Sequence, residues 1–172
     1  PRKEFFTCPN HAGDQMNGYI LKPTNFDPSK RYPVVMSQYS GPGSQSVLDK
    51  WTIDWEYYLV SKGFIVACVD GRGTGGRSRA YETSVYMQLG KLETEDQVAG
   101  AEYMRTLPYV DDKHIGIYGW SYGGYETLMA MSTSNGTYQA GVAIAPVTDW
   151  RYYDTIYAER FMRTPNENNE GY

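Results

Sequence analysis

The sequence contains few residues that bind metals, and it lacks the long apolar and basic runs of membrane and nucleic-acid-binding proteins. Two cysteines and two histidines occur among 172 residues, without the spacing of a metal-ligand cluster. No apolar run approaches the ~18 residues of a membrane span. Sixteen Lys and Arg residues against 20 Asp and Glu residues give a net charge of −4. We therefore expect no metal or other cofactor, no membrane span and no nucleic-acid partner.

The length and composition favour one domain. A chain of 172 residues with 41% hydrophobic residues can bury a sizeable core. It begins at Pro1 instead of Met and stops at Tyr172 without a closing helix or strand. We therefore expect residues 1–172 to be part of a longer protein.

The apolar pattern predicts an α/β fold with a mostly parallel central sheet and flanking helices. We expect strands over residues 4–7, 19–21, 32–36, 63–69, 115–119 and 138–145. The first two are expected to be antiparallel, with a turn that ends at Asn17-Gly18. We expect helices over residues 48–62, 94–107 and 122–132, the second capped by Thr94. The acids Glu93, Glu95, Asp96 and Glu102 are expected on an exposed helix face.

The segment from Gly119 to Gly123 has the pattern G-x-S-x-G between a predicted strand and a predicted helix. A strand that turns abruptly into a helix leaves the central serine, Ser121, exposed in a strained conformation. Larger side chains at 119 and 123 would collide, which explains the glycines. The backbone N–H of Tyr122 would point to where an oxyanion forms. The pattern therefore predicts a nucleophilic serine.

Further motifs make the resemblance specific. They are Gly119 to Tyr125, Tyr39 to Gln45, Asp70 to Gly73, Trp150 to Asp154 and Tyr157 to Arg160. In order and spacing, the sequence resembles the dipeptidyl peptidase IV branch of the prolyl oligopeptidase family of serine peptidases. The resemblance covers nearly the whole chain. It implies a truncated α/β-hydrolase fold, lacking the last strands and helices, with a propeller domain upstream.

The resemblance also implies roles for individual residues. Ser121 is implied as the acylated nucleophile, and the Tyr39 hydroxyl is implied to complete the oxyanion hole with the Tyr122 N–H. The apolar box for the substrate proline is implied to consist of Tyr122, Val147, Trp150, Tyr153 and Tyr157. A rigid pyrrolidine suits flat aromatic walls. The implied substrate is a peptide with a penultimate proline, from which an X-Pro (or X-Ala) dipeptide is released.

A serine hydrolase also needs a histidine base and an acid that orients it. His114 begins the strand that leads to Ser121, which places it at the far end of the sheet, and His11 lies in the first predicted turn. Asp149 and Asp154 are expected to be loop residues of the pocket. The resemblance places the triad acid and histidine beyond residue 172. We therefore expect this chain alone to be inactive, and residues 138–145 to form an unpaired edge strand.

Several alternatives remain open. A tripeptidyl or acylaminoacyl peptidase of the same family, a carboxylesterase and a non-catalytic interaction domain each fit part of the pattern.

We expect Cys8 and Cys68 to be buried thiols. Segment 70–76 lacks the lysine of a phosphate-binding loop, so we expect no phosphate site there. The resemblance further implies a homodimer and a periplasmic or cell-surface location, neither of which is visible in these residues.

Overall fold

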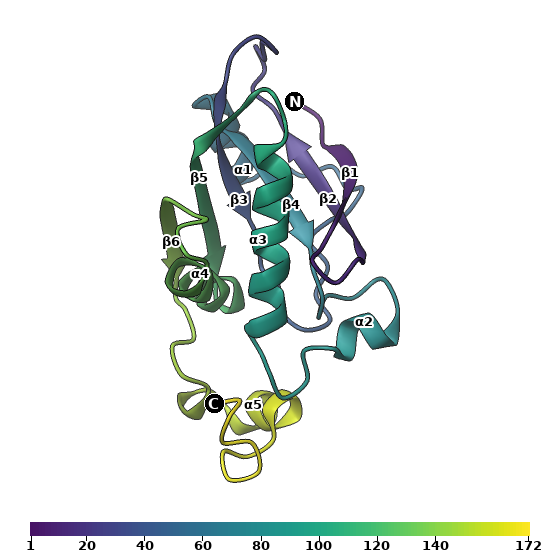
Figure 1. The fold of residues 1–172 in the computed structure, drawn as a ribbon, viewed down its shortest axis with the longest axis vertical. Coiled ribbons are helices and arrows are strands. Elements are labelled where there is room, and N and C mark those ends of the chain that lie inside the picture. The colour runs from purple at the N-terminus through teal and green to yellow at the C-terminus, as the bar shows by residue number, and fades with distance from the viewer.

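Six strands form one mixed sheet in the order β1-β2-β4-β3-β5-β6 in the computed structural model, which describes residues 1–172 (Figure 1). The strands are β1 (Glu4–Pro9), β2 (Gln15–Leu21), β3 (Tyr32–Ser37), β4 (Ile65–Asp70), β5 (Val110–Trp120) and β6 (Ala140–Ile144). The helices are α1 (Trp55–Ser61), α2 (Arg79–Thr83), α3 (Lys91–Arg105), α4 (Tyr122–Thr133) and α5 (Thr155–Met162), with a 3₁₀ turn η1 (Trp150–Tyr152). The chain has the predicted α/β architecture.

The pairing of the strands divides the sheet in two. Strands β1, β2 and β4 pair antiparallel, whereas β4, β3, β5 and β6 pair parallel. The carboxyl ends of the parallel strands therefore meet at one edge of the sheet. Segments α2 and α5 lie beyond that edge, at the lower end of Figure 1.

The first hairpin has the predicted pairing but a different turn. Asn17 and Gly18 lie within β2, opposite Thr7 and Phe6, so the prediction of a turn at Asn17-Gly18 is wrong. The chain reverses at residues 10–14, where the Asn10 side chain accepts hydrogen bonds from two backbone N–H groups. A Cβ on Gly18 would lie 2.5 Å from the Phe6 ring. That glycine therefore serves close packing across the strands.

Alternate residues of β4 face two separate cores. Ile65, Ala67 and Val69 pack into the larger core with residues of α3 and α4, whereas Val66 and Cys68 pack with residues of α1. Helices thus cover both faces, and every residue of β4 is buried. Cys8 belongs to the larger core and Cys68 to the smaller one, and both are buried and free. The prediction of buried thiols is confirmed.

Two predicted helix boundaries are wrong. Helix α1 begins only at Trp55, because the side chain of Asp54 accepts from the Glu56 N–H and caps the helix there. Leu48 and Trp51 precede the helix. Helix α3 begins at Lys91 after Gly90, whose φ of 88° is left-handed. Thr94 therefore lies inside the helix instead of capping it.

The prediction of an exposed acidic face on α3 is wrong for two of its four residues. Glu93 and Asp96 are buried, whereas Glu102 is exposed. Each buried carboxylate receives hydrogen bonds from a distant segment, Glu93 from Tyr122 and Asp96 from Arg72. Such bonds offset the cost of removing a charge from water.

Strand β6 lies at the edge of the sheet, as predicted, and pairs only with β5. Four of its five residues are exposed, including Val142 and Ile144. Trp120 at the end of β5 is exposed as well. None of the helices combines the length and the apolar character needed to cross a membrane.

Candidate active site

Ser121 lies between the last residue of β5 and the first residue of α4. Its backbone has φ 56° and ψ −117°, a conformation that costs roughly 1–3 kcal/mol for a residue with a side chain. The Ser121 N–H donates to the Ile144 carbonyl oxygen at 2.9 Å, and its carbonyl oxygen accepts from the Tyr125 N–H at 3.1 Å. Pairing with β6 and the start of α4 thus hold the strained turn predicted from the sequence.

Both glycines of the turn are required by close backbone approach. A Cβ on Gly119 would collide with the carbonyl oxygen of Gly123. A Cβ on Gly123 would lie 2.5 Å from the Gln38 carbonyl oxygen and 3.1 Å from the Tyr39 Cα. The steric reason inferred from the sequence is therefore confirmed, and the second contact shows that β3 ends against the turn.

Gln38 holds the Tyr39 segment against the serine turn, a role that the sequence analysis missed. Its buried amide donates to the Gly123 carbonyl oxygen at 2.7 Å and to Thr127 Oγ1 at 3.2 Å. The Ser40 hydroxyl in turn donates to Gln38 Oε1 at 2.8 Å. Tyr39 thus lies between two residues that are tied to the turn, with its ring 6.2 Å from that of Tyr122.

Four of the five residues predicted for the proline box, Tyr122, Val147, Trp150 and Tyr157, meet Tyr39 in one cluster. The rings of Tyr122 and Trp150 are 5.6 Å apart, and Trp150 stacks on Tyr157 at 5.7 Å and 12°. The fifth residue, Tyr153, borders the cluster. Its ring lies 5.2 Å from that of Tyr157 and is 40% exposed. Segments far apart in the sequence therefore form one aromatic wall beside Ser121.

Asp149 and Asp154 cap the two helical segments of this wall. Asp149 Oδ1 accepts from the Arg151 N–H at 2.9 Å, and Asp154 Oδ1 accepts from the Tyr157 N–H at 2.8 Å. Asp154 thereby starts α5, which carries Tyr157. The two carboxylates position the wall.

Neither histidine lies at the serine. His114, near the middle of β5, contacts Asp111 at 2.7 Å and is exposed. His11 lies in the β1–β2 turn and contacts Glu102 at 2.7 Å. Both side chains are exposed. The prediction that His114 begins its strand is wrong, because β5 already begins at Val110. Both histidines are therefore engaged with carboxylates away from the serine turn.

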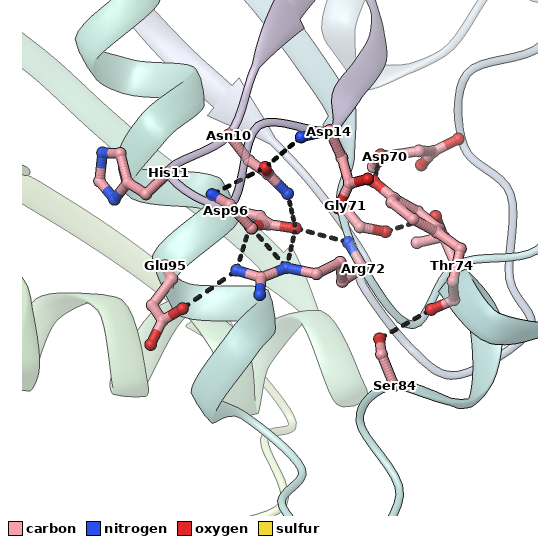
Figure 2. A network of polar contacts seen from close by, with 12 residues as sticks. Asn10, His11, Asp14, Asp70, Gly71, Arg72, Thr74, Ser84, Glu95 and Asp96 are labelled. Carbon is pink, nitrogen blue, oxygen red and sulfur yellow. Dashed lines mark hydrogen bonds and ion pairs between the residues drawn. The ribbon is translucent and has the colours of Figure 1, made fainter.

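The glycine-rich segment after β4 is held by ion pairs (Figure 2). The Arg72 guanidinium donates to Asp96 through Nε and Nη2 and to Glu95 at 3.0 Å. Asn10 donates to the same Asp96 carboxylate at 3.3 Å. The two acids raise the pKa of Arg72. This network joins the first hairpin, the segment after β4 and α3.

The same segment supports the chain that follows Tyr39. The Gly43 N–H donates to the Gly73 carbonyl oxygen, and the Gly75 N–H donates to the Ser44 carbonyl oxygen, both at 2.8 Å. The Asp70 carboxylate accepts from the backbone N–H of Val47, also at 2.8 Å. Residues 39–47 are thus fixed on one side by the serine turn and on the other by the segment after β4.

Two buried carboxyl groups lie under the serine turn, and the sequence analysis missed both. Glu93 Oε1 accepts from the Tyr122 hydroxyl at 2.6 Å, and Glu126 is completely buried one turn further along α4. Burial raises the pKa of Glu93 to about 7 and that of Glu126 well above its usual range. Helical spacing could have revealed Glu93, because it precedes the buried residues Gln97 and Ala101 by four and eight positions.

The raised pKa of Glu93 predicts that stability falls as pH rises. Between its usual value of 4.5 and about 7, the folded protein retains a proton that the unfolded chain releases. The free energy of unfolding therefore decreases across this window, by about 3 kcal/mol at 1.36 kcal/mol per pKa unit. We expect Glu93→Gln to reduce the difference in Tm between pH 5 and pH 7.5, followed by tryptophan fluorescence. Glu102→Gln, an exposed change on the same helix, should leave that difference unaltered, and equal slopes in all three proteins would contradict the prediction.

Comparisons with known proteins agree with this geometry. Residues 51–172 match the model of the prolyl oligopeptidase family. The chain is 46% identical over 162 residues to a probable dipeptidyl-aminopeptidase B of Metarhizium robertsii, covering 93% of this chain and 18% of the relative. It is 50% identical over 153 residues to a protein of the same name from Ajellomyces dermatitidis, covering 88% of this chain and 17% of the relative. The chain thus spans less than a fifth of the length of these relatives.

A solved structure has the same fold. The crystal structure of Porphyromonas gingivalis dipeptidyl peptidase 4 superposes with a TM-score of 0.96 at 58% identity. The similarity covers 99% of this chain and 24% of that one. The fold described above is therefore shared with part of a much longer chain.

Proposed function

This chain belongs to the prolyl oligopeptidase family, and on that basis we propose that it is the nucleophile-bearing part of a serine peptidase. The proposed activity is the release of X-Pro and X-Ala dipeptides from the N-termini of peptides. The observation that carries this proposal is the position of Ser121, in a strained turn beside the aromatic wall of Tyr122, Trp150 and Tyr157. The names of the relatives support the dipeptidyl preference.

In the proposed reaction, Ser121 Oγ attacks the carbonyl carbon of the penultimate residue and forms an acyl-enzyme. The Oγ proton passes to a histidine of the longer protein and then to the leaving amine. The Tyr39 hydroxyl and the Tyr122 N–H donate to the oxygen that becomes negative. Water then hydrolyses the ester and regenerates Ser121. The aromatic wall holds the proline ring throughout, because flat apolar faces fit a rigid pyrrolidine.

The two histidines of this chain are engaged elsewhere, so we propose that the 172 residues do not hydrolyse peptides by themselves. The base, its acid and the groups that bind the substrate amine are proposed to belong to other parts of the longer protein. A carboxylesterase is the second candidate, since a serine turn alone fits one. The aromatic wall, which matches a cyclic side chain, favours the peptidase.

The test is hydrolysis of a Gly-Pro chromogenic anilide by the full-length protein, beside its N-acetylated analogue. We expect cleavage of the free-amine substrate and at least a 100-fold lower kcat/KM for the blocked one, because a dipeptidyl peptidase binds the free amine. Preference for the blocked substrate would indicate an acylaminoacyl peptidase or endopeptidase instead. Inactivity on both, with hydrolysis of a p-nitrophenyl ester, would favour the esterase. The isolated 172-residue chain is the negative control, and substantial activity in it would contradict the assignment of the base to another segment.

A further inference from the structure

The buried carboxyl groups of Glu93 and Glu126 lie beneath the residue that follows the nucleophile. Glu93 belongs to the first turn of α3 and Glu126 to α4, and the two are 1% and 0% exposed. Charged residues are almost never this deeply buried without partners. The proposed reaction uses neither of them, so their hydrogen bonds must explain their presence.

Both oxygens of Glu93 are occupied. Oε1 accepts from the Tyr122 hydroxyl at 2.6 Å, and Oε2 accepts from the Gly90 N–H at 3.0 Å. The second bond anchors the carboxylate to the start of its own helix, where the helix dipole favours negative charge. The Glu93 side chain therefore forms a short link between a rigid helix terminus and the Tyr122 phenol.

Glu126 is fully buried and has a single hydrogen-bond partner, Thr94. Thr94 Oγ1 lies 2.6 Å from the Gly90 carbonyl oxygen and 2.9 Å from Glu126 Oε1. A hydroxyl has a single proton, and a carbonyl can only accept it. Thr94 can therefore donate fully to only one of these two oxygens at a time. The absence of any partner for Glu126 Oε2 agrees with an uncharged group.

Tyr122 has two proposed roles at the site. Its backbone N–H faces the developing oxyanion, and its ring is the part of the proline wall nearest to Ser121 in sequence. The ring packs against Tyr39, Tyr125 and Trp150 at centroid distances of 5.5–6.2 Å. These ring contacts leave the hydroxyl of Tyr122 free to bond elsewhere. It donates to Glu93 Oε1, and this bond fixes the far end of the ring.

We infer that Glu93 is a positioning residue of the site: through the Tyr122 hydroxyl it sets the orientation of the ring that forms the proline wall and of the N–H that binds the oxyanion. This inference rests on the proposed function, because it assigns Glu93 a part in the reaction at Ser121. Glu93 acts through Tyr122 and does not itself touch the substrate. Glu126 has no such link, since its carboxyl group bonds only to Thr94.

The groups that face Glu93 make its effect dependent on pH. From α4 they are Tyr122, Tyr125 and Glu126. From α5 there is Tyr157, and from the start of α3 there are the Gly90 N–H and Asp96. No cation is among them. Burial and, to a smaller extent, Asp96 raise the pKa of Glu93, while its hydrogen bonds to Tyr122 and Gly90 lower it, with a result of about 7. Below that pH the protonated group is a weaker acceptor for the phenol, so the anchor is strongest above neutrality.

The test compares Glu93→Gln, Tyr122→Phe and the double variant in the full-length protein. Glutamine keeps the size of the side chain, but its amide group can accept from only one of the two donors. We expect each single variant to lower kcat/KM for a Gly-Pro anilide by about 10- to 100-fold. The kcat/KM of the double variant should lie within about 3-fold of that of the less active single variant, because both changes remove the same interaction. If the losses of kcat/KM in the two single variants multiply in the double variant, the inference is overturned.

Three further readouts separate positioning from loss of stability. The ratio of Gly-Pro to Gly-Ala hydrolysis should fall in Glu93→Gln, whereas partial unfolding would reduce both rates equally. The acid limb of the kcat/KM profile should also shift in this variant. Glu102→Gln on the same helix should leave activity within about 2-fold. An unchanged substrate ratio together with an unchanged pH profile would overturn the inference.

The rate at which a fluorophosphonate probe labels Ser121 keeps the inference independent of the peptide preference. Labelling requires the nucleophile and the oxyanion hole but no dipeptide pocket. If the wild-type protein is labelled yet cleaves no dipeptidyl anilide, the proposed function fails, and the inference is then judged on labelling alone. A slower rate in both single variants supports it, and wild-type rates in both overturn it. If Glu93→Gln does not fold, Tyr122→Phe alone decides the outcome by the same criterion.

Discussion

Replacement of Ser121 by alanine is expected to lower kcat for Gly-Pro anilide hydrolysis by roughly 10⁴-fold or more in the full-length protein. The alanine side chain has no nucleophile, so no acyl-enzyme can form. Binding and oxyanion stabilisation remain and leave only a small residual rate. The fold should be retained, because the backbone hydrogen bonds of Ser121 to Ile144 and Tyr125 do not involve its side chain. Initial rates and circular dichroism measure the two expectations.

A matched control for Ser121→Ala is available on α4, the helix that follows Ser121. Ser132 is exposed near the end of α4, where its hydroxyl donates to the Leu128 carbonyl oxygen at 2.8 Å. Ser132→Ala should keep the wild-type rate within about 2-fold, since surface changes of this kind alter little. A Ser121→Ala protein that retains more than about 1% of wild-type activity would show that another group is the nucleophile.

Replacement of Tyr39 by phenylalanine is expected to lower kcat by roughly 10²- to 10³-fold with little change in KM. The change removes a single hydroxyl that we propose donates to the oxyanion, which carries its charge only in the transition state. The ring that packs 6.2 Å from Tyr122 stays in place, and so does the backbone held through Gln38 and Ser40. Steady-state kinetics with the Gly-Pro anilide measure the effect.

The control for this experiment is Tyr58→Phe. Tyr58 lies in α1, its ring stacks on Trp55, and it is half exposed. Its variant should behave as wild type. A Tyr39→Phe protein that loses activity only through KM would indicate that the hydroxyl binds the ground state of the substrate instead of the oxyanion.

The serine turn could be predicted from the sequence because it depends on local sterics. Gly119 and Gly123 are four positions apart, and the collision that excludes larger side chains occurs within this short segment and its immediate neighbour. The strands around it were equally predictable, since continuous apolar runs such as the one in β4 are typical of strands buried on both faces. The aromatic wall followed from the family resemblance, and the structure brings its members together.

The errors occurred where an interaction other than apolar spacing or turn composition decides the local structure. Asn17-Gly18 has the composition of a turn, but pairing of β2 with both β1 and β4 keeps it extended. Apolar spacing suggested a helix from residue 48, yet capping by Asp54 and packing of Val60 against β4 place its start at Trp55. The partners of Asn17-Gly18 lie in other strands, whereas the Asp54 cap is a local signal that apolar spacing alone does not contain.

The buried acids show most clearly which features the local sequence decides and which depend on the tertiary structure. Local sequence determined that Glu93 and Asp96 lie on a helix, that Ser121 follows a strand and that the glycines on either side of it allow a sharp turn. Only the tertiary structure decided that these two charges are buried, because their donors come from Tyr122, 29 positions further along the chain, and from Arg72, 24 positions before. Burial of a charge is tolerated when such donors converge on it, and their convergence is a property of the folded chain.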